Sequence, residues 1–397
     1  MGALWLDGEG RSSVAHRVKG GTRVEHKKLF ALSSVVSATA LLVGTAPAAA
    51  EEGSRYGPIA MIPVAGVALT SFDISWVDYP SQTFYLADRS NNQIDRVDAR
   101  NDTLLSPIGK GKFVGFRGKN SISGPNGVLE IRSLHQLWVG DGNSRVHVID
   151  AQTGQFLHTI STAKCGIPGC NPRRSDELAY DPKDHLIVIA NNEDDPPYLT
   201  FISTEDHQVK GHLDFPAALD GLEQPIWDGA THSIYQAVPE TAAHPGGEID
   251  VIDPLTRTVT DIFPIVDKNG APLRCNPHGL AIGAHHHLLV GCGSKAGISV
   301  VINIRDGKTV AVIRKVGGSD EVWYNPGDRN YYLAARDNPG GAVLGIIDAD
   351  SNTWIQNVKT NPNAHSLAAN LANRHIYVPM GPPRCTPGCI GVFAATS

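Results

Sequence analysis

One strand pattern recurs seven times in this chain and restricts the fold more than any other feature. Each unit opens with a small polar cluster, runs through an apolar strand, a turn and two more strands, and often ends its third strand in Ile-Asp before a fourth. A period of about 50 residues with four short strands per unit is typical of a β-propeller. The units begin near Asp73, Asn126, Asp176, Gln224, His278, Asp320 and His365. The sequence therefore predicts an all-β fold, a seven-bladed β-propeller.

The last unit holds only three strands before Ser397, so the ring needs a strand from elsewhere. The apolar segment Pro58–Gly66 stands outside the seven units and can supply it. A ring closed by both ends of the chain leaves no free sheet edge inside the circle. We therefore expect the N-terminal strand to complete the last blade, within a single propeller domain over residues 51–397.

Residues 1–50 have the composition of an export signal rather than of a blade. A basic start at His26 to Lys28 precedes an apolar run from Leu29 to Gly44, and small residues lead to Ala50. This three-part pattern predicts a secretory signal peptide cleaved near Ala50 and a periplasmic or secreted product with no membrane span. An uncleaved anchor is the alternative. The polar residues before His26 are unusual for a signal peptide and suggest a start site placed too far upstream.

Export sets the chemistry expected of the six cysteines. An even number of cysteines in an exported chain favours disulfides. Cys165 and Cys170, like Cys385 and Cys389, flank short Pro-Gly turns, and Cys275 and Cys292 flank two successive strands. We expect the disulfides Cys165–Cys170, Cys275–Cys292 and Cys385–Cys389. A four-thiolate zinc cage is the alternative.

The charge of the chain excludes one class of partner. The net charge is −6, and no Lys/Arg run stands out after the signal segment, so we expect no nucleic-acid partner. The sequence also lacks a phosphate-binding Gly loop and a haem-attachment motif, so we expect no nucleotide, flavin or haem.

Several units resemble the YVTN/YncE-like seven-bladed propellers. "VHVIDAQTGQFLHTI" at Val146–Ile160 is the closest match, and Ile249–Ile262 and Gly345–Val358 are looser ones. The resemblance implies the architecture and no catalytic motif. A weaker likeness, in "EQPIWDG" and "DEVWYNP", is to SMP-30/gluconolactonase-type propellers, in which a Glu at this place helps to hold a divalent cation.

The tripeptide Ser-Asp-Glu occurs at Ser175–Glu177 and again at Ser319–Glu321, each time just before a first strand. The starts of the innermost strands meet at one mouth of a propeller, so these residues should face each other on blades three and six. We expect a central funnel there that binds a small molecule. The candidate ligand-binding residues are Asp73, Asn126, Asp176, Glu223, Asp320, Arg89 and Arg336.

Four funnel residues have side chains suited to catalysis: Glu177, Glu321, His278 and His365. Carboxylates and imidazoles act as acids and bases, and His278, His365 and Glu321 are the candidate ligands of a divalent cation, Ca²⁺ or Zn²⁺. The structural alternative is that the short polar residues cap turns and the histidines are satisfied in the fold.

Two function classes follow from this pattern. One is a metal-assisted hydrolase or lyase, lactonase-like, acting on a small molecule in the funnel. The other is a non-catalytic propeller that binds a ligand or a protein through its loops. The first requires Glu177, Glu321, His278 and His365 to converge.

Overall fold

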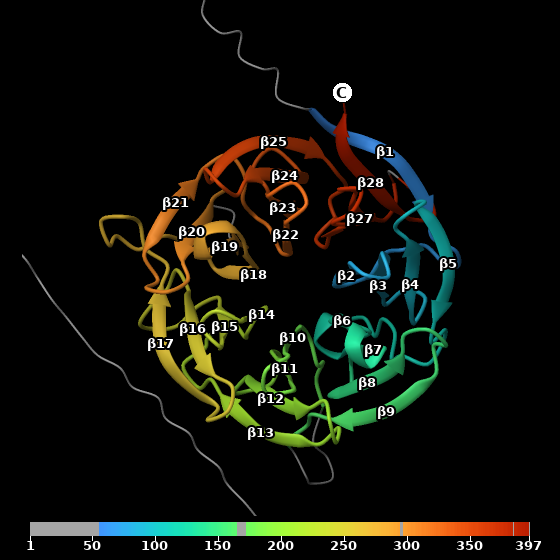
Figure 1. Cartoon of the computed structure of the whole chain (residues 1–397), viewed down its shortest axis with the longest axis horizontal. Coiled ribbons are helices and arrows are strands. Elements are labelled where there is room, and N and C mark those ends of the chain that lie inside the picture. Colours follow the sequence, from blue (N-terminus) through green and yellow to red (C-terminus); the bar gives the residue numbers. More distant parts are fainter. Residues whose placement is uncertain (1–54, 165–171, 294–296, 384, 397) are drawn as a thin grey trace, which may run out of the picture. The chain divides into compact units, whose positions relative to one another are not determined.

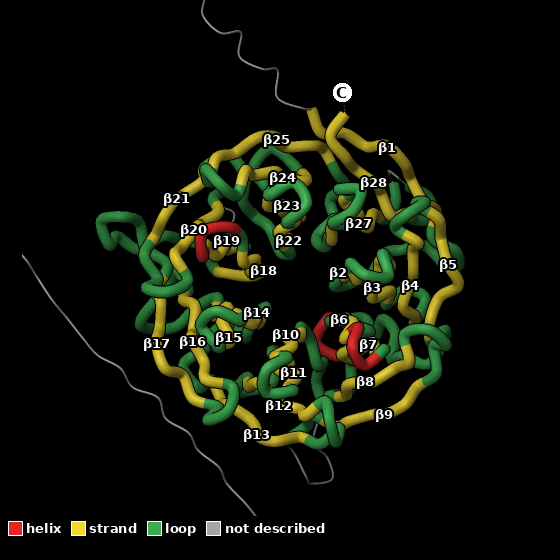
Figure 2. Tube along the Cα trace, in the orientation of Figure 1, coloured by secondary structure: helices red, strands yellow, loops and turns green. Residues whose placement is uncertain are grey.

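The computed structural model describes residues 55–164, 172–293, 297–383 and 385–396. Within these residues, 28 strands form seven four-stranded antiparallel sheets, which stand around a common centre as the blades of a β-propeller (Figures 1 and 2). The predicted fold class is thereby confirmed. The predicted signal peptide lies outside the described residues, and none of the helices inside them has the length and hydropathy of a membrane span.

The first four blades follow the chain from the innermost strand outward. Blade one has β2 (Ser75–Asp78), β3 (Thr83–Asp88), β4 (Gln93–Asp98) and β5 (Thr103–Ile108). Blade two has β6 (Val128–Ile131), β7 (Gln136–Asp141), β8 (Arg145–Asp150) and β9 (Phe156–Ser161). Blade three has β10 (Leu178–Asp181), β11 (Leu186–Asn191), β12 (Tyr198–Ser203) and β13 (Val209–Asp214). Blade four has β14 (Pro225–Asp228), β15 (Ser233–Val238), β16 (Glu248–Asp253) and β17 (Thr258–Pro264).

The last three blades complete the circle. Blade five has β18 (Pro277–Ile282), β19 (His287–Cys292), β20 (Ser299–Asn303) and β21 (Thr309–Ile313). Blade six has β22 (Val322–Asn325), β23 (Asn330–Ala335), β24 (Val343–Asp348) and β25 (Thr353–Lys359). Blade seven has β26 (Ala368–Ala369), β27 (Ile376–Met380), β28 (Cys389–Thr396) and β1 (Arg55–Pro63). The short 3₁₀ turns among the described residues are Asn120–Ile122, Arg132–Leu134 and Ala284–His286.

The outer strand of blade seven comes from the N-terminal side of the chain, as predicted. β1 pairs antiparallel with β28, from Arg55 opposite Thr396 to Pro63 opposite Cys389. The strand begins and ends three residues earlier than the predicted Pro58–Gly66. Gly66 lies outside it because it has a φ of +116°, and a Cβ there would collide with the side chain of Asn91. That conformation is open to Gly and ends the strand.

The core is divided among the interfaces between blades. Each pair of neighbouring blades among the described residues shares its own cluster of buried apolar side chains. The second strands are therefore covered on both faces, and β11, with the sequence LIVIAN, is buried along its whole length. The outer strands, such as β13, are covered on one face only and stay partly exposed. Two-sided burial explains why the second strands are continuous apolar runs rather than alternating ones.

The recurring Ile-Asp has a local cause. Asp150, Asp253 and Asp348 end the third strands of their blades. Their Oδ1 atoms accept backbone N–H groups three residues on, at 2.7 Å, 3.0 Å and 2.7 Å respectively. An Asp side chain at this place closes the turn into the outer strand. The Asp of each motif is therefore part of the scaffold.

Candidate functional site

A cavity of about 340 Å³ opens where the innermost strands begin. The residues that line it and that the sequence predicted are Asp73, Arg89, Asp176, Glu177, Glu223, His278, Asp320, Arg336 and His365. Asn126 and Glu321 lie immediately behind this lining, against Arg89 and Glu177 respectively. All eleven predicted funnel residues thus gather at one mouth of the propeller.

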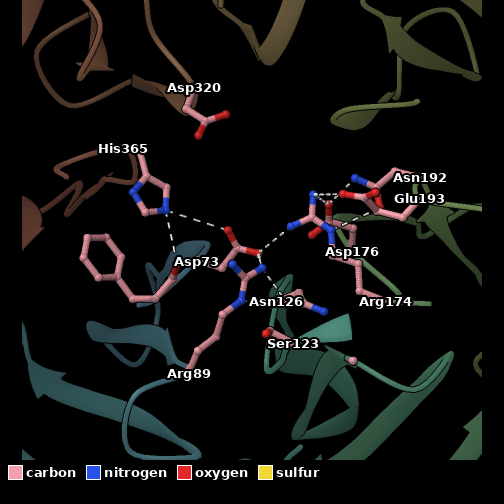
Figure 3. A network of polar contacts seen from close by, with 12 residues as sticks. Asp73, Arg89, Ser123, Asn126, Arg174, Asp176, Asn192, Glu193, Asp320 and His365 are labelled. Atoms are coloured by element: carbon pink, nitrogen blue, oxygen red, sulfur yellow. Dashed lines mark hydrogen bonds and ion pairs between the residues drawn. The ribbon is translucent and has the colours of Figure 1, made fainter. Parts of the chain in front are cut away.

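Arg89 and Asp73 form a buried ion pair at the blade-one side of the cavity (Figure 3). The side chain of Arg89 is 2% exposed, and its Nε and Nη2 also donate to Asn126 Oδ1 at 3.0 Å and 2.7 Å. Asn126 Nδ2 in turn donates to the backbone oxygen of Ser175 at 2.8 Å. Burial opposes the charge on Asp73, but Arg89 and its neighbours outweigh it and lower the pKa of Asp73 to about 2. This chain of contacts connects blades one, two and three.

Arg174 is a central residue of the site that the sequence analysis did not select (Figure 3). Its Nη2 lies 2.8 Å from Asp176 Oδ2, and its Nη1 lies 3.7 Å from Asp73 Oδ2. Asn192 accepts from Arg174 Nε at 3.2 Å and donates to Asp176 Oδ2 at 2.7 Å. The available signal was its place directly before Ser-Asp-Glu, where the second copy has Gly318.

The carboxyl group of Asp176 remains only half satisfied. Its Oδ1 is buried without a hydrogen-bond partner, and the residue is 4% exposed. Burial raises the pKa of Asp176 to about 8, although Arg174 favours the charged form. The carboxyl group of Asp176 thus keeps one oxygen that the described residues do not pair.

His278 lies between two carboxylates. Its Nδ1 is 3.1 Å from Asp320 Oδ1 and 3.8 Å from Glu223 Oε1. Arg336 Nη2 contacts the other oxygen of Asp320 at 3.0 Å. Burial disfavours the imidazolium, but Glu223 and Asp320 together prevail and raise the pKa of His278 to about 9. The raised pKa therefore favours the doubly protonated, positively charged form of the His278 ring at neutral pH.

Gly293 makes room for the His278 ring. A Cβ at Gly293 would overlap Nε2 of His278. Any larger residue would push the imidazole away from Glu223 and Asp320, so the position of the ring depends on this glycine.

Glu177 and Glu321 directly precede β10 and β22, strands on opposite sides of the ring (Figure 1), and their side chains form a hydrogen bond with each other. Both are buried, and Glu177 Oε2 has no hydrogen-bond partner. Burial raises the pKa of both groups well above the usual range, and the charge of Glu321 adds to the effect on Glu177. Asp73, Asp176 and Asp320 each have an arginine partner and Glu223 has His278, whereas Glu177 and Glu321 have no cationic partner among the described ion pairs.

His365 plays a different part from His278. Its Nδ1 lies 2.7 Å from the backbone oxygen of Asn363 and its Nε2 lies 3.2 Å from that of Phe72. The ring also stacks on Phe72, with 4.5 Å between centroids. Both ring nitrogens thus face backbone acceptors, which fixes blade seven against blade one.

The metal ligands predicted from sequence are not the set that the structure brings together. The prediction was His278, His365 and Glu321. Among the described residues, the side chains whose ligand atoms lie within 4.8 Å of one another are Glu223, His278 and Asp320. His365 is turned toward backbone oxygens and Glu321 toward Glu177, so only His278 is common to both sets.

Two of the three predicted disulfides are confirmed: Cys275–Cys292 and Cys385–Cys389. The first joins the residues before β18 to the end of β19, close to His278, and both of its cysteines are fully buried. Cys165–Cys170 lies outside the described residues.

The comparisons with known proteins agree with the architecture. No family model and no curated protein matches this chain. Among solved structures, it is similar to a chain of the mitotic checkpoint complex, with 13% identity and a TM-score of 0.62 over 92% of this chain and 100% of that one. It is also similar to the WD40 repeats of RRP9, with 11% identity and a TM-score of 0.63 over 85% of this chain and 98% of that one.

The chain is a β-propeller. At these identities the likeness shows the fold alone, and the chemistry has to be argued from the cavity.

Proposed function

We propose that this protein is an exported propeller that binds a small polar molecule in its charged central cavity. The observation that carries the proposal is the meeting of charged side chains from blades one, three, four, five and six, with His365 of blade seven, around one space of about 340 Å³. Buried ionic groups are costly to assemble. The cost is understandable where they recognise a ligand, since unrelated functions share this fold and differ in the site.

The lining favours a ligand rich in hydroxyl groups. Arginine and histidine donors alternate with carboxyl acceptors, and most charges already have partners. A hydroxyl both donates and accepts, so it can join such pairs without adding net charge. A sugar lactone combines several hydroxyls with a carbonyl that can be attacked.

The donor set also fits a divalent cation. Glu223, His278 and Asp320 supply two carboxylates and an imidazole, a combination that suits Zn²⁺ and related ions, and Glu177 lines the same cavity. When bound, such an ion polarises a carbonyl or activates a water.

Hydrolase or lyase chemistry would use the same residues. Burial raises the pKa values of Glu177 and Glu321, and the two side chains lie next to each other, so the pair would offer a general acid beside a general base. Without a bound cation, the imidazolium form of His278 would instead stabilise an oxyanion. Membership of the YVTN/YncE-like propellers and removal of the signal peptide near Ala50 belong to the same proposal.

The experiment measures binding and turnover separately on protein spanning residues 51–397. Calorimetry with gluconolactone, with and without added Zn²⁺ or Ca²⁺, should show binding that Glu177→Gln weakens about tenfold or more. The matched control is Glu130→Gln, which changes another buried Glu that accepts from Tyr85 away from the cavity. Equal binding by both variants would contradict the proposal.

A pH-stat assay of lactone hydrolysis with and without a chelator then separates an enzyme from a non-catalytic binder. Loss of hydrolysis with the chelator identifies the metal-assisted reaction. Binding without hydrolysis identifies the alternative, a propeller scaffold. For export, the N-terminus of protein recovered outside the cytoplasm should be Glu51.

A further inference from the structure

The segment that joins β5 to β6 concentrates positive charge in an otherwise acidic protein (Figure 1). Residues 103–129 include Lys110, Lys112, Arg117 and Lys119 and no Asp or Glu, whereas the whole chain has a net charge of −6. All four of these basic residues are exposed. We call residues 109–124 the basic loop. Its local charge favours an anionic partner.

The basic loop is fixed to the propeller beside the charged cavity. Phe113 is 4% exposed, and its ring packs against that of Phe156, with 5.6 Å between centroids. The backbone N–H of Val114 donates to the Asp141 carboxylate, with 3.2 Å to each oxygen. Asn120, further along the loop, lines the charged cavity. The loop therefore lies on the face of the disc that carries the cavity mouth, against blades one and two.

Phe116 has the opposite environment to Phe113. It is 51% exposed, although it follows Phe113 by only three residues. Gly115 and Gly118, on either side, have φ values of +75° and +81°, which turn the chain around Phe116 and Arg117. A single exposed apolar side chain is ordinary in proteins. This one differs because it stands in a segment whose charges are all positive.

Arg145 adds a fifth cation to the same edge of the disc. It is exposed at the start of β8 and lies opposite Asp141, the residue that holds the basic loop at Val114. Asp141 itself is buried, and its Oδ2 lies 3.2 Å from His147 Nε2. None of the five cations takes part in an ion pair among the described residues. Their charges are therefore available to a partner.

We propose that the basic loop docks this protein on an anionic lipid surface. Phe116 would enter the headgroup layer while Lys110, Lys112, Arg117, Lys119 and Arg145 face the lipid phosphates. Each Lys or Arg near such a surface strengthens binding about fivefold. An anionic polysaccharide would pair with the same cations, but it offers no apolar layer to the Phe116 ring, and a lipid surface does. The docking does not depend on any ligand in the charged cavity.

The charge of the neighbouring blade limits how the disc can approach. The loop after β11 in blade three carries Glu193 and Asp195, which are partly or fully exposed. An anionic surface repels these carboxylates. Contact is therefore expected at the edge formed by the basic loop and Arg145, with the disc tilted rather than flat.

The test is sedimentation with lipid vesicles. The protein spans residues 51–397, which contain all seven blades and both strands that close the ring, and which leave out the apolar run of the signal segment. Vesicles of phosphatidylglycerol and phosphatidylcholine in equal parts should bind the protein, and vesicles of phosphatidylcholine alone should not. Because the cations are exposed, high salt should weaken the binding.

Two variants separate the contributions of charge and ring. Arg117→Gln combined with Lys119→Gln removes two cations and should weaken binding to the mixed vesicles at least tenfold, at about fivefold for each charge. Phe116→Ser should weaken that binding about fivefold and leave binding to dextran sulfate, a soluble polyanion, unchanged. The altered side chains are exposed, so the fold should be kept, and circular dichroism checks it.

Matched controls change the same residue types elsewhere. Lys268→Gln combined with Lys359→Gln removes two exposed lysines outside blades one and two. Leu255→Ser removes an apolar side chain that is 57% exposed in the turn between β16 and β17. Both controls should bind the mixed vesicles as the unmodified protein does.

Three results would overturn the proposal. The first is no binding to the mixed vesicles at low salt. The second is an equal loss for the lysine control and for the Arg117 and Lys119 variant, which would mean attraction without a defined surface. The third is unchanged vesicle binding by Phe116→Ser, or binding to dextran sulfate alone, which would assign the basic loop to a soluble polyanion instead of a lipid surface.

Discussion

Glu177 and Glu321 interact across the centre of the propeller, and each is the last residue of a Ser-Asp-Glu tripeptide. In both copies the preceding Asp has an arginine partner, Arg174 for Asp176 and Arg336 for Asp320. The two arginines come from different places in the blade, one before the inner strand and one after β23. The repeated tripeptide thus gives the same result twice: an Asp held by an ion pair and a Glu without a cationic partner among the described ion pairs.

Replacing one of these glutamates should stabilise the metal-free protein at high pH. Folding raises the pKa of Glu177 from 4.5. Below pH 4.5 the carboxyl group is protonated in both the folded and the unfolded chain, so it does not change the free energy of unfolding. As the pH rises toward the folded-state pKa, only the unfolded chain ionises freely, and the folded protein loses stability. In chelator, Glu177→Gln should gain about 1–3 kcal/mol at pH 9 and nothing near pH 4. Urea unfolding across that range measures it, with exposed Glu205→Gln as control. A less stable variant at pH 9 would mean that the carboxylate has a partner.

His278 should show the opposite pH dependence. Its pKa rises from 6.5 to about 9 on folding, so its contribution is complete below pH 6.5 and disappears as the pH rises through about 9. We expect His278→Gln to lose up to about 3 kcal/mol at pH 6 and little above pH 9.5. The matched control is the same substitution at exposed His158, on β9. Histidine ring NMR gives the pKa directly, and a value near 6.5 would refute the ion-pair geometry.

The Asp73–Arg89 pair should be one of the most sensitive points of the scaffold. Asp73→Asn leaves the buried Arg89 without its counter-charge, and breaking a buried pair costs about 3–5 kcal/mol. Asp214→Asn breaks a pair with Lys164 in which both side chains are more than a third exposed, and should cost less than about 1 kcal/mol. Chemical unfolding of both variants is the measurement. Similar losses for the two would show that burial does not set the cost.

The two described disulfides should contribute unequally. Cys275 and Cys292 are 17 residues apart and Cys385 and Cys389 only 4, and the loop entropy removed from the unfolded chain grows with loop length. Replacing the first pair by Ala should cost about 3 kcal/mol, and the second about 2 kcal/mol. The first replacement should also alter the His278 resonances, because the bridge lies beside β18. Unchanged resonances would show that the ring is positioned by Gly293 and the carboxylates alone.

The fold was predictable because each blade repeats the same sequence pattern of apolar strands and turn-closing residues. Turn-closing residues such as Asp150 recur at the same place, so the period gives both the number of blades and the end of each third strand. The exact end of β1 was not predictable. It depends on the close approach of Gly66 to Asn91, a residue of another blade, and sequence alone does not show that contact.

The sequence predicted which residues gather at the site but not which of them form ion pairs and hydrogen bonds with one another. Placing polar residues at the starts of the inner strands brought the right groups to one mouth. Which of them pair depends on side-chain direction, and both nitrogens of His365 contact backbone oxygens although the ring lines the cavity and its Nε2 lies 3.8 Å from Asp73 Oδ1. Arg174 was missed because it lies before the inner strand β10, whereas the two arginines that were selected, Arg89 and Arg336, follow the second strands of their blades.

The pairing of β1 with β28 has a consequence for biosynthesis. A ribosome makes residues 55–63 among the first of the propeller and residues 389–396 among the last, yet the two segments are neighbours in one sheet. Until translation is nearly finished, the earlier segment has no hydrogen-bonding partner and the disc stays open. Assembly of the native protein is therefore coupled to completion of the polypeptide, and a prematurely terminated product would retain an unsatisfied β-edge.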